Sequence, residues 1–513
     1  MKSHIHPLQN TSLDGFSPNV QEILEKFKFR NQIDTMIDAD ILSAVIEKFI
    51  SPTVNLSPTP VLADNGEVRL PALDNHAMGT IFEELIRRFN EENNEEAGEH
   101  FTPRDVVELM ADLVFIPIAD KIQDSTYSCY DGASGTGGML TVAQERLNTL
   151  AVEHGKDVSI HLFGQEINPE TYAITKADML LKGDGEEAEH IAFGSTLSTD
   201  GFPTYDFDFM LSNPPYVKSW KVDAEKMGGK KDILDPRFVV THGGDSEFGM
   251  IPRTSDGQLL FLLNNISKMK NSTELGSRIA EVHNGSSLFT GDAGQGESNA
   301  RRFMIENDLV ECIVALPEKM FYNTGIGTYI WILSNRKSSE RQGKIQLIDA
   351  TSIKSPLRKN LGEKNCELTA ELRRQIVELY LTMAENEQSK IFENREFGYW
   401  KVTVLQPMLD KTGLPVRDKK GNLKPDKDLT DTEQIPFTYE GGIETFLEQE
   451  VRPFAPYAWI DEKQTKIGYE INFIKYFYRP MELRSLEEIV ADLKKLEIET
   501  EDMLLEVMED AAK

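Results

Sequence analysis

Apolar residues recur at steps of three and four along the first part of the chain, which predicts helices. Three such runs cover residues 20–27, 41–49 and 81–89, and the first follows a Ser-Pro pair suited to an N-cap and a first helical position. This spacing gathers the apolar side chains on one face of each helix. We therefore expect an N-terminal helical domain over residues 1–95, in which these faces form the core of a small bundle.

The pattern changes after an acidic connection at residues 90–98. Short runs of β-forming residues at 127–130, 160–165 and 207–212 are separated by longer segments, one of which begins as a helix at Met139. Strands separated by helices are typical of a mostly parallel sheet. We therefore expect an α/β domain after the helical one.

A helix start is predicted ahead of the first of these strands. Thr102 is the expected cap, Pro103 the first helical residue, and Asp105 an acid in the first turn, where it favours the helix dipole. The free backbone donors of such a turn could receive a carboxylate. A plain capped helix would have the same sequence.

A glycine-rich turn at residues 131–138 follows the first strand. Glycine lets the backbone approach a ligand closely, and the absence of a following Gly-Lys-Ser/Thr excludes a P-loop. The next strand ends at Glu166, about where nucleotide-binding folds place an acid on ribose hydroxyls. This unit predicts a site for a ribose-bearing cofactor. Both a nicotinamide dinucleotide and S-adenosylmethionine contain such a ribose.

The third strand runs into Asn213, Pro214, Pro215 and Tyr216. The prolines stop the strand, because each lacks a donor and fixes φ. Asn213 is thereby held at the strand tip, where its Oδ1 and the Pro214 carbonyl suit an amino group with two hydrogens to donate. Tyr216 offers a flat face for a planar base. A strand end with a rigid turn is the structural alternative.

Composition limits the candidates further. At 513 residues the chain is long enough for two to four domains, and its net charge of -30 repels a polyanion at long range. Nucleic acid must then be held by a local patch or through a partner. The longest apolar run is too short for a membrane span, and the N-terminus lacks the apolar core of a signal peptide. The three cysteines indicate neither a disulfide framework nor a zinc site, so a reducing compartment fits.

Basic residues with glycines between them follow the Asn213 motif. In so acidic a chain they are the best candidates for phosphate contact, although a solvated flexible loop is the alternative. Further on, a polar, turn-rich piece at 411–434 and acidic helices give no sign of a base-reading surface. The basic residues are Lys218, Lys221, Lys226, Lys230, Lys231 and Arg237.

Taken together, these segments resemble the modification (M, methyltransferase) subunit of bacterial type I restriction-modification systems, in the N6-adenine DNA methyltransferase family. The resemblance runs from the N-terminus through Lys337, with a weaker match in the C-terminal helices. Its motifs stand in the family's order: Phe101 to Pro103, Asp131 to Gly138, Glu166, and Asn213 to Tyr216. Residues 276–280 resemble the family's next strand, 315–325 the turn before its last hairpin, and 329–333 its antiparallel closing strand.

The resemblance implies a fold and a division of the chain. It implies an α/β, Rossmann-like S-adenosylmethionine-dependent methyltransferase domain at 96–345, with a mostly parallel sheet and an antiparallel closing hairpin. The helical domain at 1–95 would precede it. A mixed accessory region at 346–480 and a C-terminal helix at 481–513 would follow.

The resemblance also implies the site. Asn213, Pro214, Pro215 and Tyr216 would be catalytic, without a metal, in methyl transfer to N6 of a flipped adenine. Lys218, Lys221, Lys230 and Lys231 would contact DNA. S-Adenosyl-L-methionine would be the cofactor, bound by Glu99, His100, Phe101, Thr102, Pro103, Arg104, Asp131, Gly135, Thr136, Gly137, Gly138, Glu166 and Ser195.

Two departures from the family accompany this assignment. Relatives usually carry Asp in place of Ser195 to touch the cofactor adenine or the target base, and serine carries no charge. Gly132 and Ser134 stand where the family commonly has Pro and a Cys or Ala, which we expect the loop to tolerate.

Double-stranded DNA, a specificity (S) subunit and, through the complex, a restriction (R) subunit are the implied partners, with two M chains for each S chain, in a bacterial or archaeal cytoplasm. Ser485 and Glu488 have capping-box spacing, and the apolar residues after them follow coiled-coil steps. We expect this helix to dock on the S subunit, and a helix packed on its own domain is the alternative. The apolar residues are Leu486, Ile489, Leu493, Leu496, Met503, Leu504 and Val507.

Two other classes of function remain. Asn-Pro-Pro-Tyr also occurs in methyltransferases that act on protein glutamine or on guanine in RNA, but those enzymes usually lack the long helical N-terminal domain and the Phe-Thr-Pro segment. An inactive scaffold that holds a partner on DNA is the second. Retention of Asn213, Glu166 and the glycines together disfavours it.

Overall fold

The computed structural model describes residues 15–73, 102–182, 186–322 and 324–478, with isolated residues at 13, 81, 85, 491, 492 and 494. The chain divides into two compact units, Met1–Ile471 and Asn472–Lys513, and the second contains α15 (Phe473–Phe477). The expectations for the docking helix lie outside the described residues. No helix in the described ranges is both long and apolar enough to cross a membrane.

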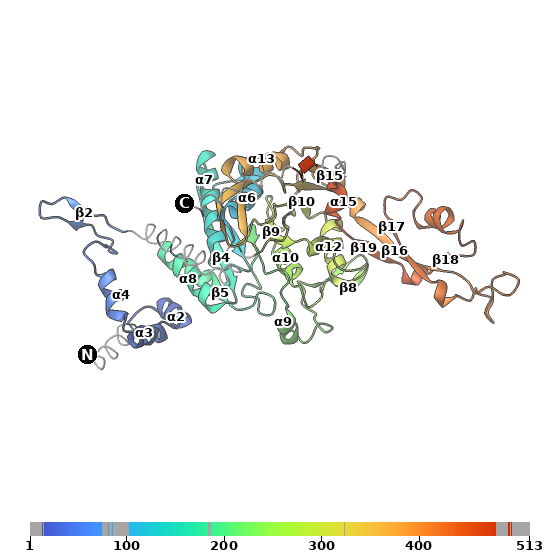
Figure 1. Ribbon diagram of the computed structural model, residues 1–513, viewed down its shortest axis with the longest axis horizontal. Coiled ribbons are helices and arrows are strands. Elements are labelled where there is room, and N and C mark those ends of the chain that lie inside the picture. Colours follow the sequence, from blue (N-terminus) through green and yellow to red (C-terminus); the bar gives the residue numbers. More distant parts are fainter. Residues whose placement is uncertain are drawn as a thin grey trace. The chain divides into compact units, whose positions relative to one another are not determined.

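A nine-stranded sheet forms the centre of the first unit (Figure 1), in the order β15-β12-β10-β11-β9-β6-β3-β4-β5. The strands from β5 to β9 are parallel, whereas β11 is antiparallel to both of its neighbours. This arrangement confirms the predicted α/β class with an antiparallel strand in a mostly parallel sheet. The bounds are β3 (Ser125–Asp131), β4 (Val158–Glu166), β5 (Ile191–Phe193), β6 (Phe209–Ser212), β9 (Arg278–Asn284), β10 (Val310–Ala315), β11 (Thr328–Ser334), β12 (Lys344–Asp349) and β15 (Ser389–Glu393).

The sheet extends further along the chain than the sequence indicated. β12 pairs in parallel with β10, and β15 pairs with β12 in antiparallel orientation. The hairpin of β10 and β11 therefore does not close the sheet, contrary to the expectation from the resemblance. The boundary predicted at residue 345 falls inside β12.

The chain reverses its direction of winding at β3. From β3 it moves outward to β4 and β5, and then returns to β6 on the other side of β3. The carboxyl ends of β3 and β6 therefore flank a topological switch point, the position where open α/β sheets bind ligands. The glycine turn follows β3 and Asn213 follows β6. Because these strands are neighbours, both segments lie at this edge of the sheet.

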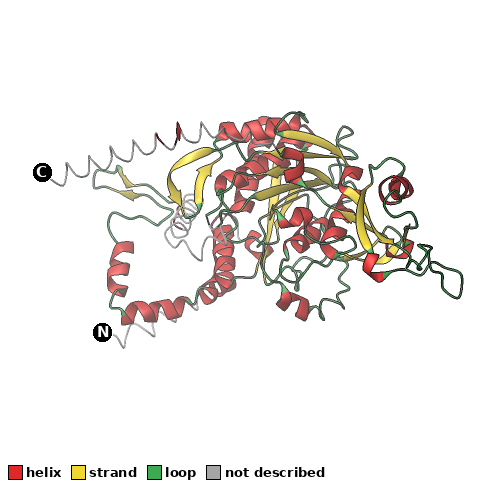
Figure 2. Ribbon diagram, turned by 45° about the vertical axis from the view of Figure 1, so that its right-hand side comes forward, coloured by secondary structure: helices red, strands yellow, loops and turns green. Residues whose placement is uncertain are grey.

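Helices cover both faces of the sheet (Figure 2). α6 (Arg104–Phe115), α7 (Gly138–Glu153), α8 (Pro169–Lys182) and α13 (Ala370–Leu381) contribute to one core with Ala280 and Val282 of β9. Glu281 lies between those two residues and so points to the opposite face, where it accepts a hydrogen bond from Asn265 of α10 (Gln258–Ser267). α12 (Gly296–Glu306) packs beside α10.

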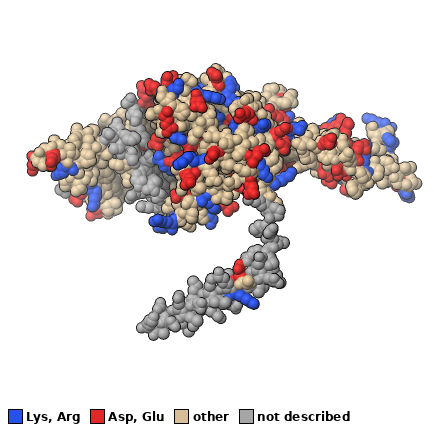
Figure 3. All heavy atoms as spheres, turned by 90° about the horizontal axis from the view of Figure 1, so that it is seen from above, with Lys and Arg blue, Asp and Glu red and all other residues tan. Residues whose placement is uncertain are grey.

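Charged side chains of both signs are mixed on one face of the molecule (Figure 3). On the face drawn in Figure 3, Asp and Glu are scattered among Lys and Arg. The large negative net charge is thus spread over many positions, which leaves room for a local basic patch.

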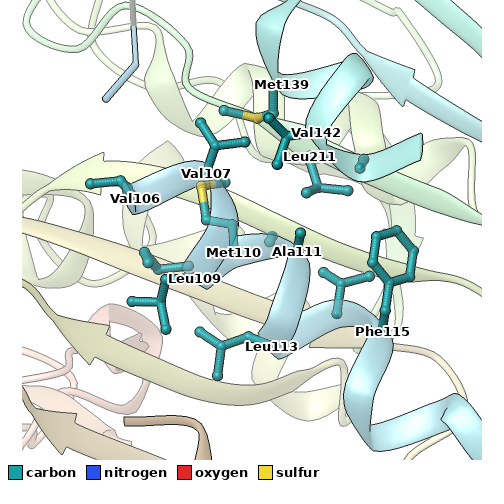
Figure 4. Close-up of a cluster of buried hydrophobic side chains, with 14 of the residues drawn as sticks. Val106, Val107, Leu109, Met110, Ala111, Leu113, Phe115, Met139, Val142 and Leu211 are labelled. Atoms are coloured by element: carbon teal, nitrogen blue, oxygen red, sulfur yellow. The ribbon is translucent and has the colours of Figure 1, made fainter. Parts of the chain in front are cut away.

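α6 is packed over most of its surface, with Arg104, Glu108 and Asp112 on its polar side. Its apolar residues lie between Met139 and Val142 of α7 and Leu211 of β6 (Figure 4). An apolar face of this width is typical of a helix that packs against a core. The buried residues of α6 are Val106, Val107, Leu109, Met110, Ala111, Leu113, Val114 and Phe115.

Two of the three predicted N-terminal helices fall in the described residues. α2 (Pro18–Lys26) and α4 (Leu42–Phe49) match the runs at 20–27 and 41–49, and α3 (Phe29–Asp38) and a hairpin of β1 (Val61–Leu62) and β2 (Val68–Leu70) also form. The run at 81–89 lies outside the described residues apart from 81 and 85. Within residues 15–73, Ile23 is the one buried apolar side chain, and Phe49 is 64% exposed, so these helices alone do not form a closed core.

A second, smaller sheet lies in the accessory region. β16 (Gly398–Leu405) pairs with β17 (Asp431–Pro436), β18 (Trp459–Ile460) and β19 (Lys466–Tyr469), around a core that includes Val402 and Ile435. Tyr469 joins it to α12, because its backbone oxygen accepts from Arg301 Nε at 2.7 Å and its backbone nitrogen donates to Ser298 Oγ at 3.0 Å. The remaining elements are α9 (Lys221–Lys226), β7 (Val239–His242), β8 (Asp245–Gly249), α11 (Ser286–Phe289), β13 (Ser355–Leu361), β14 (Lys364–Glu367) and α14 (Gly442–Phe446).

Candidate active site

A cavity of about 590 Å³ opens at the carboxyl ends of β3, β4, β5 and β6. Its volume lies in the range of small-molecule sites. The four predicted catalytic residues, Asn213, Pro214, Pro215 and Tyr216, line it together. Of the predicted cofactor ligands, Thr102, Asp131, Gly135, Thr136, Gly138, Glu166 and Ser195 also line it.

Asn213 lines this cavity and has a buried side-chain acceptor that no described residue uses. Its Nδ2 donates to Thr102 Oγ1 at 2.9 Å. This bond fixes the orientation of the amide and leaves Oδ1 as the atom without a partner in the described part of the chain. That Oδ1 is buried and has no hydrogen-bond partner among the described residues. An unsatisfied buried acceptor costs about 1–3 kcal/mol, so its position indicates a donor supplied by a ligand.

Thr102 does not have the role that the sequence indicated. α6 begins at Arg104, so Pro103 occupies the N-cap position and Thr102 lies outside the helix. The Thr102 hydroxyl is therefore not a cap and accepts from Asn213 instead. Local sequence favours the cap, but the strand tip 111 residues away supplies a donor that the isolated segment lacks.

The glycine turn bends back on itself below the cavity. Gly135 and Gly137 have φ of 53° and 80°, in the left-handed region that glycine adopts without a steric penalty. Gly135 N donates to Glu166 Oε2 at 2.8 Å, and Thr175 Oγ1 donates to Gly135 O at 2.6 Å. The backbone of Gly138 faces open space, since no described atom lies within 4 Å of where a Cβ would stand.

Two buried carboxylates make this end of the cavity acidic. Glu166 accepts from Gly135 N and from Asn168 N, one bond to each oxygen, and a lone pair remains on each oxygen. Asp131 accepts from Ser212 Oγ at 2.7 Å and from Ala133 N at 2.9 Å. Burial raises the pKa of Asp131 to about 7, and the charges of Glu166 and Glu281 add to the shift. Such a site suits a ligand that carries positive charge.

Ser195 lies in the cavity wall after β5. It is buried, and its backbone oxygen accepts from Thr199 N at 2.8 Å. Its hydroxyl adds a neutral donor and acceptor where relatives are expected to have a carboxylate. The negative side chains of the cavity are supplied by Asp131, Glu166 and also Asp223 of α9.

Aromatic and apolar walls complete the cavity, and sequence reasoning did not identify most of them. Tyr216 is half-buried against the main core, and burial raises its pKa to about 12, so it is a neutral phenol. Trp220, Phe261 and Phe321 also line the cavity, and Trp220 Nε1 donates to Arg253 O at 2.9 Å. Phe321 lies in the turn before β11 that the resemblance singled out, but nothing in the local sequence points it to this wall.

The backbone after Tyr216 is strained. Val217 has φ of 59°, which is unusual for a β-branched residue, and its N–H donates to Asp256 Oδ1 at 3.4 Å. Strained backbone persists where the surrounding structure holds it, and it clusters at functional sites.

Several predicted site residues lie elsewhere. Pro103, Arg104 and Gly137 are not part of the cavity lining. The Arg104 guanidinium instead pairs with Glu108 at 3.1 Å and Glu145 at 2.9 Å on the surface. The predicted ligands Glu99, His100 and Phe101 lie outside the described residues.

The basic segment after the motif divides into three groups. Lys218 and Lys226 line the cavity, whereas Lys221, Lys230 and Lys231 are exposed but do not line it. The assignment of Arg237 to phosphate contact is wrong, because its guanidinium forms its hydrogen bonds and ion pair inside the protein. It donates to the backbone oxygens of Thr196 and Leu197 and pairs with Asp235 at 2.7 Å. The distances to the two oxygens are 2.7 and 2.8 Å.

Comparison with known proteins gives consistent relatives. The family model described as N-6 DNA Methylase matches residues 73–398. A type I restriction enzyme methylase subunit (MjaIX) from Methanocaldococcus jannaschii is 28% identical over 331 residues, 64% of this chain and 52% of that protein. The HindI methylase subunit from Haemophilus influenzae is 29% identical over 303 residues, 56% of this chain and 57% of that protein. The chain thus spans about half the length of these relatives.

A solved structure has the same fold. The crystal structure of a type I restriction-modification system methyltransferase subunit from Streptococcus thermophilus matches with a TM-score of 0.51 and 25% identity. The match covers 63% of this chain and 61% of the other. The matched family range contains the glycine turn, Glu166 and the Asn213 motif, which are the residues gathered around the cavity.

Proposed function

The chain belongs to the N-6 DNA Methylase family, and on this premise we propose that it transfers a methyl group from S-adenosyl-L-methionine to the exocyclic N6 of adenine in double-stranded DNA. The observation that carries the proposal is the buried, unpartnered Oδ1 of Asn213, a residue that lines the cavity of about 590 Å³. It is the acceptor that an amino group requires.

The residues present fit the proposed cofactor. Glu166 retains lone pairs for ribose hydroxyls, and the open backbone at Gly138 and Gly194 leaves room beside them. A cationic ligand beside Asp131 would favour the ionised form of this carboxyl, whose pKa burial raises to about 7. When bound, this cofactor supplies a methyl group activated by a positively charged sulfur.

The protein's own contribution to the reaction is positioning. Asn213 Oδ1 and the Pro214 carbonyl accept the two hydrogens of the target amino group, which favours a pyramidal nitrogen with a free lone pair. Tyr216 packs on the base, which has left the duplex because a stacked base cannot reach the cavity. Lys218 and Lys226 at the cavity rim favour the adjacent phosphates.

Labelled methyl transfer tests this function directly. The full chain, together with its specificity subunit, is incubated with duplex DNA, RNA or protein and with S-adenosyl-L-methionine labelled in the methyl group. We expect label in DNA. Label in RNA or in a protein glutamine would favour the related amino-directed enzymes, and cofactor binding without transfer to any acceptor would favour a scaffold.

Replacing Thr102 should slow methyl transfer without weakening cofactor binding. Thr102→Val removes the acceptor that orients the Asn213 amide, so we expect kcat to fall about five- to tenfold, the effect of one hydrogen bond of about 1 kcal/mol. Thr102→Ser keeps the hydroxyl and should restore most of the rate. Equal rates for the valine and serine variants would contradict a positioning role for Thr102.

Replacing Glu166 should weaken cofactor binding. Glu166→Ala removes the proposed ribose contacts and releases Gly135, and we expect a loss of about 1.5 to 3 kcal/mol, the usual range for hydrogen bonds to a charged group. Calorimetric titration with S-adenosyl-L-methionine measures it. Glu170→Ala, which removes an exposed acid four residues further along, is the matched control. An unchanged dissociation constant for Glu166→Ala would exclude Glu166 from the site.

We further propose that the chain works with DNA-specificity and restriction subunits, as two copies for each specificity subunit, in a bacterial or archaeal cytoplasm. The support is the relatives' description as type I methylase subunits, together with a net charge that disfavours unaided DNA binding. The heptad-like spacing from Leu486 to Val507 favours a helix that docks on the specificity subunit.

Removing that helix should separate the chain from its partner. We expect a chain truncated before Ser485 to bind the cofactor normally but to lose co-purification with the specificity subunit. A complex that survives the truncation, or methylation of one unique DNA sequence by the chain alone, would contradict the docking proposal.

A further inference from the structure

The connection between β16 and β17 is far longer than a hairpin needs. The two strands are antiparallel neighbours, yet residues 406–430, here called the arm, separate them. Antiparallel neighbours are usually joined by about two to five residues. The matched family range ends at residue 398, so the arm lies beyond it. The extra chain therefore has a role that joining the strands does not explain.

The arm is built from three consecutive eight-residue units. Asp410, Asp418 and Asp426 stand at equivalent positions, and a lysine follows each of them. The Oδ1 of Asp410 accepts from the backbone nitrogens of residues 412 and 414, and the Oδ1 of Asp418 accepts from those of residues 420 and 422. Each turn thus uses its aspartate to hold its own backbone.

Backbone hydrogen bonds join the three units to one another. Met408 N donates to Lys424 O at 2.9 Å, Lys424 N donates to Val416 O at 2.9 Å, and Val416 N donates to Met408 O at 2.8 Å. Gly413 and Gly421 have φ of 83° and 85°, which lets the first two turns adopt the same left-handed bend. The arm is therefore a defined scaffold for its side chains.

The arm is basic in an otherwise acidic chain. The arm as a whole has six basic residues and four acidic ones, a net charge of +2 in a chain whose net charge is -30. All six are exposed, and in the described part of the chain none of the five lysines among them forms an ion pair. They are Lys411, Arg417, Lys419, Lys420, Lys424 and Lys427.

We propose that the arm binds the phosphate backbone of the duplex DNA that carries the methylation target, a proposal that rests on DNA being the substrate. Lys411, Lys419 and Lys427 follow the three equivalent aspartates and provide three cations on one scaffold. At physiological salt a charge acts over about 8 Å, so acidic residues further away do not cancel this patch.

The composition of the arm favours DNA over an acidic protein. Protein interfaces are enriched in aromatic residues and arginine and depleted in lysine. The arm contains no aromatic residue, and five of its six basic residues are lysines. Lysines on an ordered backbone suit sequence-independent contact with phosphates.

Salt-dependent DNA binding by the full chain tests this. The variant replaces Lys411, Lys419 and Lys427 with Gln, and anisotropy with a labelled duplex gives Kd from about 50 to 200 mM salt. Losing three phosphate contacts should raise Kd at least tenfold at the lower salt and flatten the slope of log K against log salt by about 2.7. The KM for DNA in methyl transfer should rise while kcat stays unchanged.

Two further variants separate charge from other effects. The same three positions changed to Arg should restore binding. Lys48→Gln, Lys354→Gln and Lys463→Gln together, which remove the same charge from exposed positions outside the arm, should leave the salt slope unchanged.

Each result supports or contradicts the proposal that the arm binds DNA. A triple Gln variant with an unchanged Kd and slope, in a chain that methylates DNA, would overturn the arm proposal alone. Loss of a co-purifying protein with DNA affinity intact would assign the arm to protein docking and also overturn it. A wild-type chain that neither binds nor methylates DNA in the presence of its specificity subunit would remove the proposed function, and the arm proposal with it.

Discussion

Asn213→Ala should abolish methyl transfer while the chain remains folded and binds its cofactor. The substitution removes the acceptor that would hold the target amino group, and the loss of one such preorganised group costs about a hundred- to a thousandfold in rate. Single-turnover transfer of labelled methyl to DNA measures the effect.

The stability of the same variant distinguishes a functional from a structural role. Oδ1 of Asn213 is a buried acceptor without a partner in the described structure, so its removal relieves a desolvation cost. The substitution also removes the hydrogen bond from Nδ2 to Thr102, so we expect the free energy of unfolding of Asn213→Ala to stay within about 1 kcal/mol of the wild-type value. A variant that transfers methyl at near the original rate would contradict the mechanism, and one that loses activity only because it unfolds would point to a structural role.

Glu311→Ala should destabilise the fold by about 3–5 kcal/mol, because it leaves a buried charge unpaired. Glu311 Oε2 accepts from Arg278 at 2.8 Å and from the Tyr380 hydroxyl at 2.5 Å, and the Arg278 and Glu311 side chains are 4% and 3% exposed. Burial alone would raise the pKa of Glu311, but Arg278 and Tyr380 hold it below its usual value. The variant would bury the Arg278 guanidinium without its counter-ion.

Urea denaturation measures this effect, with Glu225→Ala as the control. Glu225 pairs with Lys221 at 3.9 Å on the surface and is 66% exposed, so its loss should cost less than about 1 kcal/mol. If Glu311→Ala lowers the free energy of unfolding as little as Glu225→Ala does, water or another group compensates the charge of Arg278.

The sequence predicted the parts of the site that depend on local signals. The strands at 127–130 and 160–165 lie within β3 and β4, and the glycine turn, Glu166 and Asn213 come to the same cavity. These predictions succeeded because glycine, proline and β-branched residues fix backbone geometry over a few residues, and because parallel strands bring their carboxyl ends to one edge.

What the sequence missed depends on contacts between distant segments. The bond from Asn213 to Thr102 spans 111 residues, and it replaces a helix cap that local sequence favoured. Arg237 resembled its lysine neighbours in sequence but is enclosed by the backbone of Thr196 and Leu197. The pairing of β12 and β15 with the main sheet is likewise non-local. Periodicity predicted the N-terminal helices but carries no information on what covers their apolar faces.

Identification of the methylated nucleoside tests the central claim most directly. After reaction of the full chain with its specificity subunit, duplex DNA and S-adenosyl-L-methionine, the DNA is digested to nucleosides and analysed by mass spectrometry. The cavity and Asn213 predict N6-methyladenine that disappears with Asn213→Ala. Methylation of another base, or N6-methyladenine at the wild-type level with Asn213→Ala, would contradict the account.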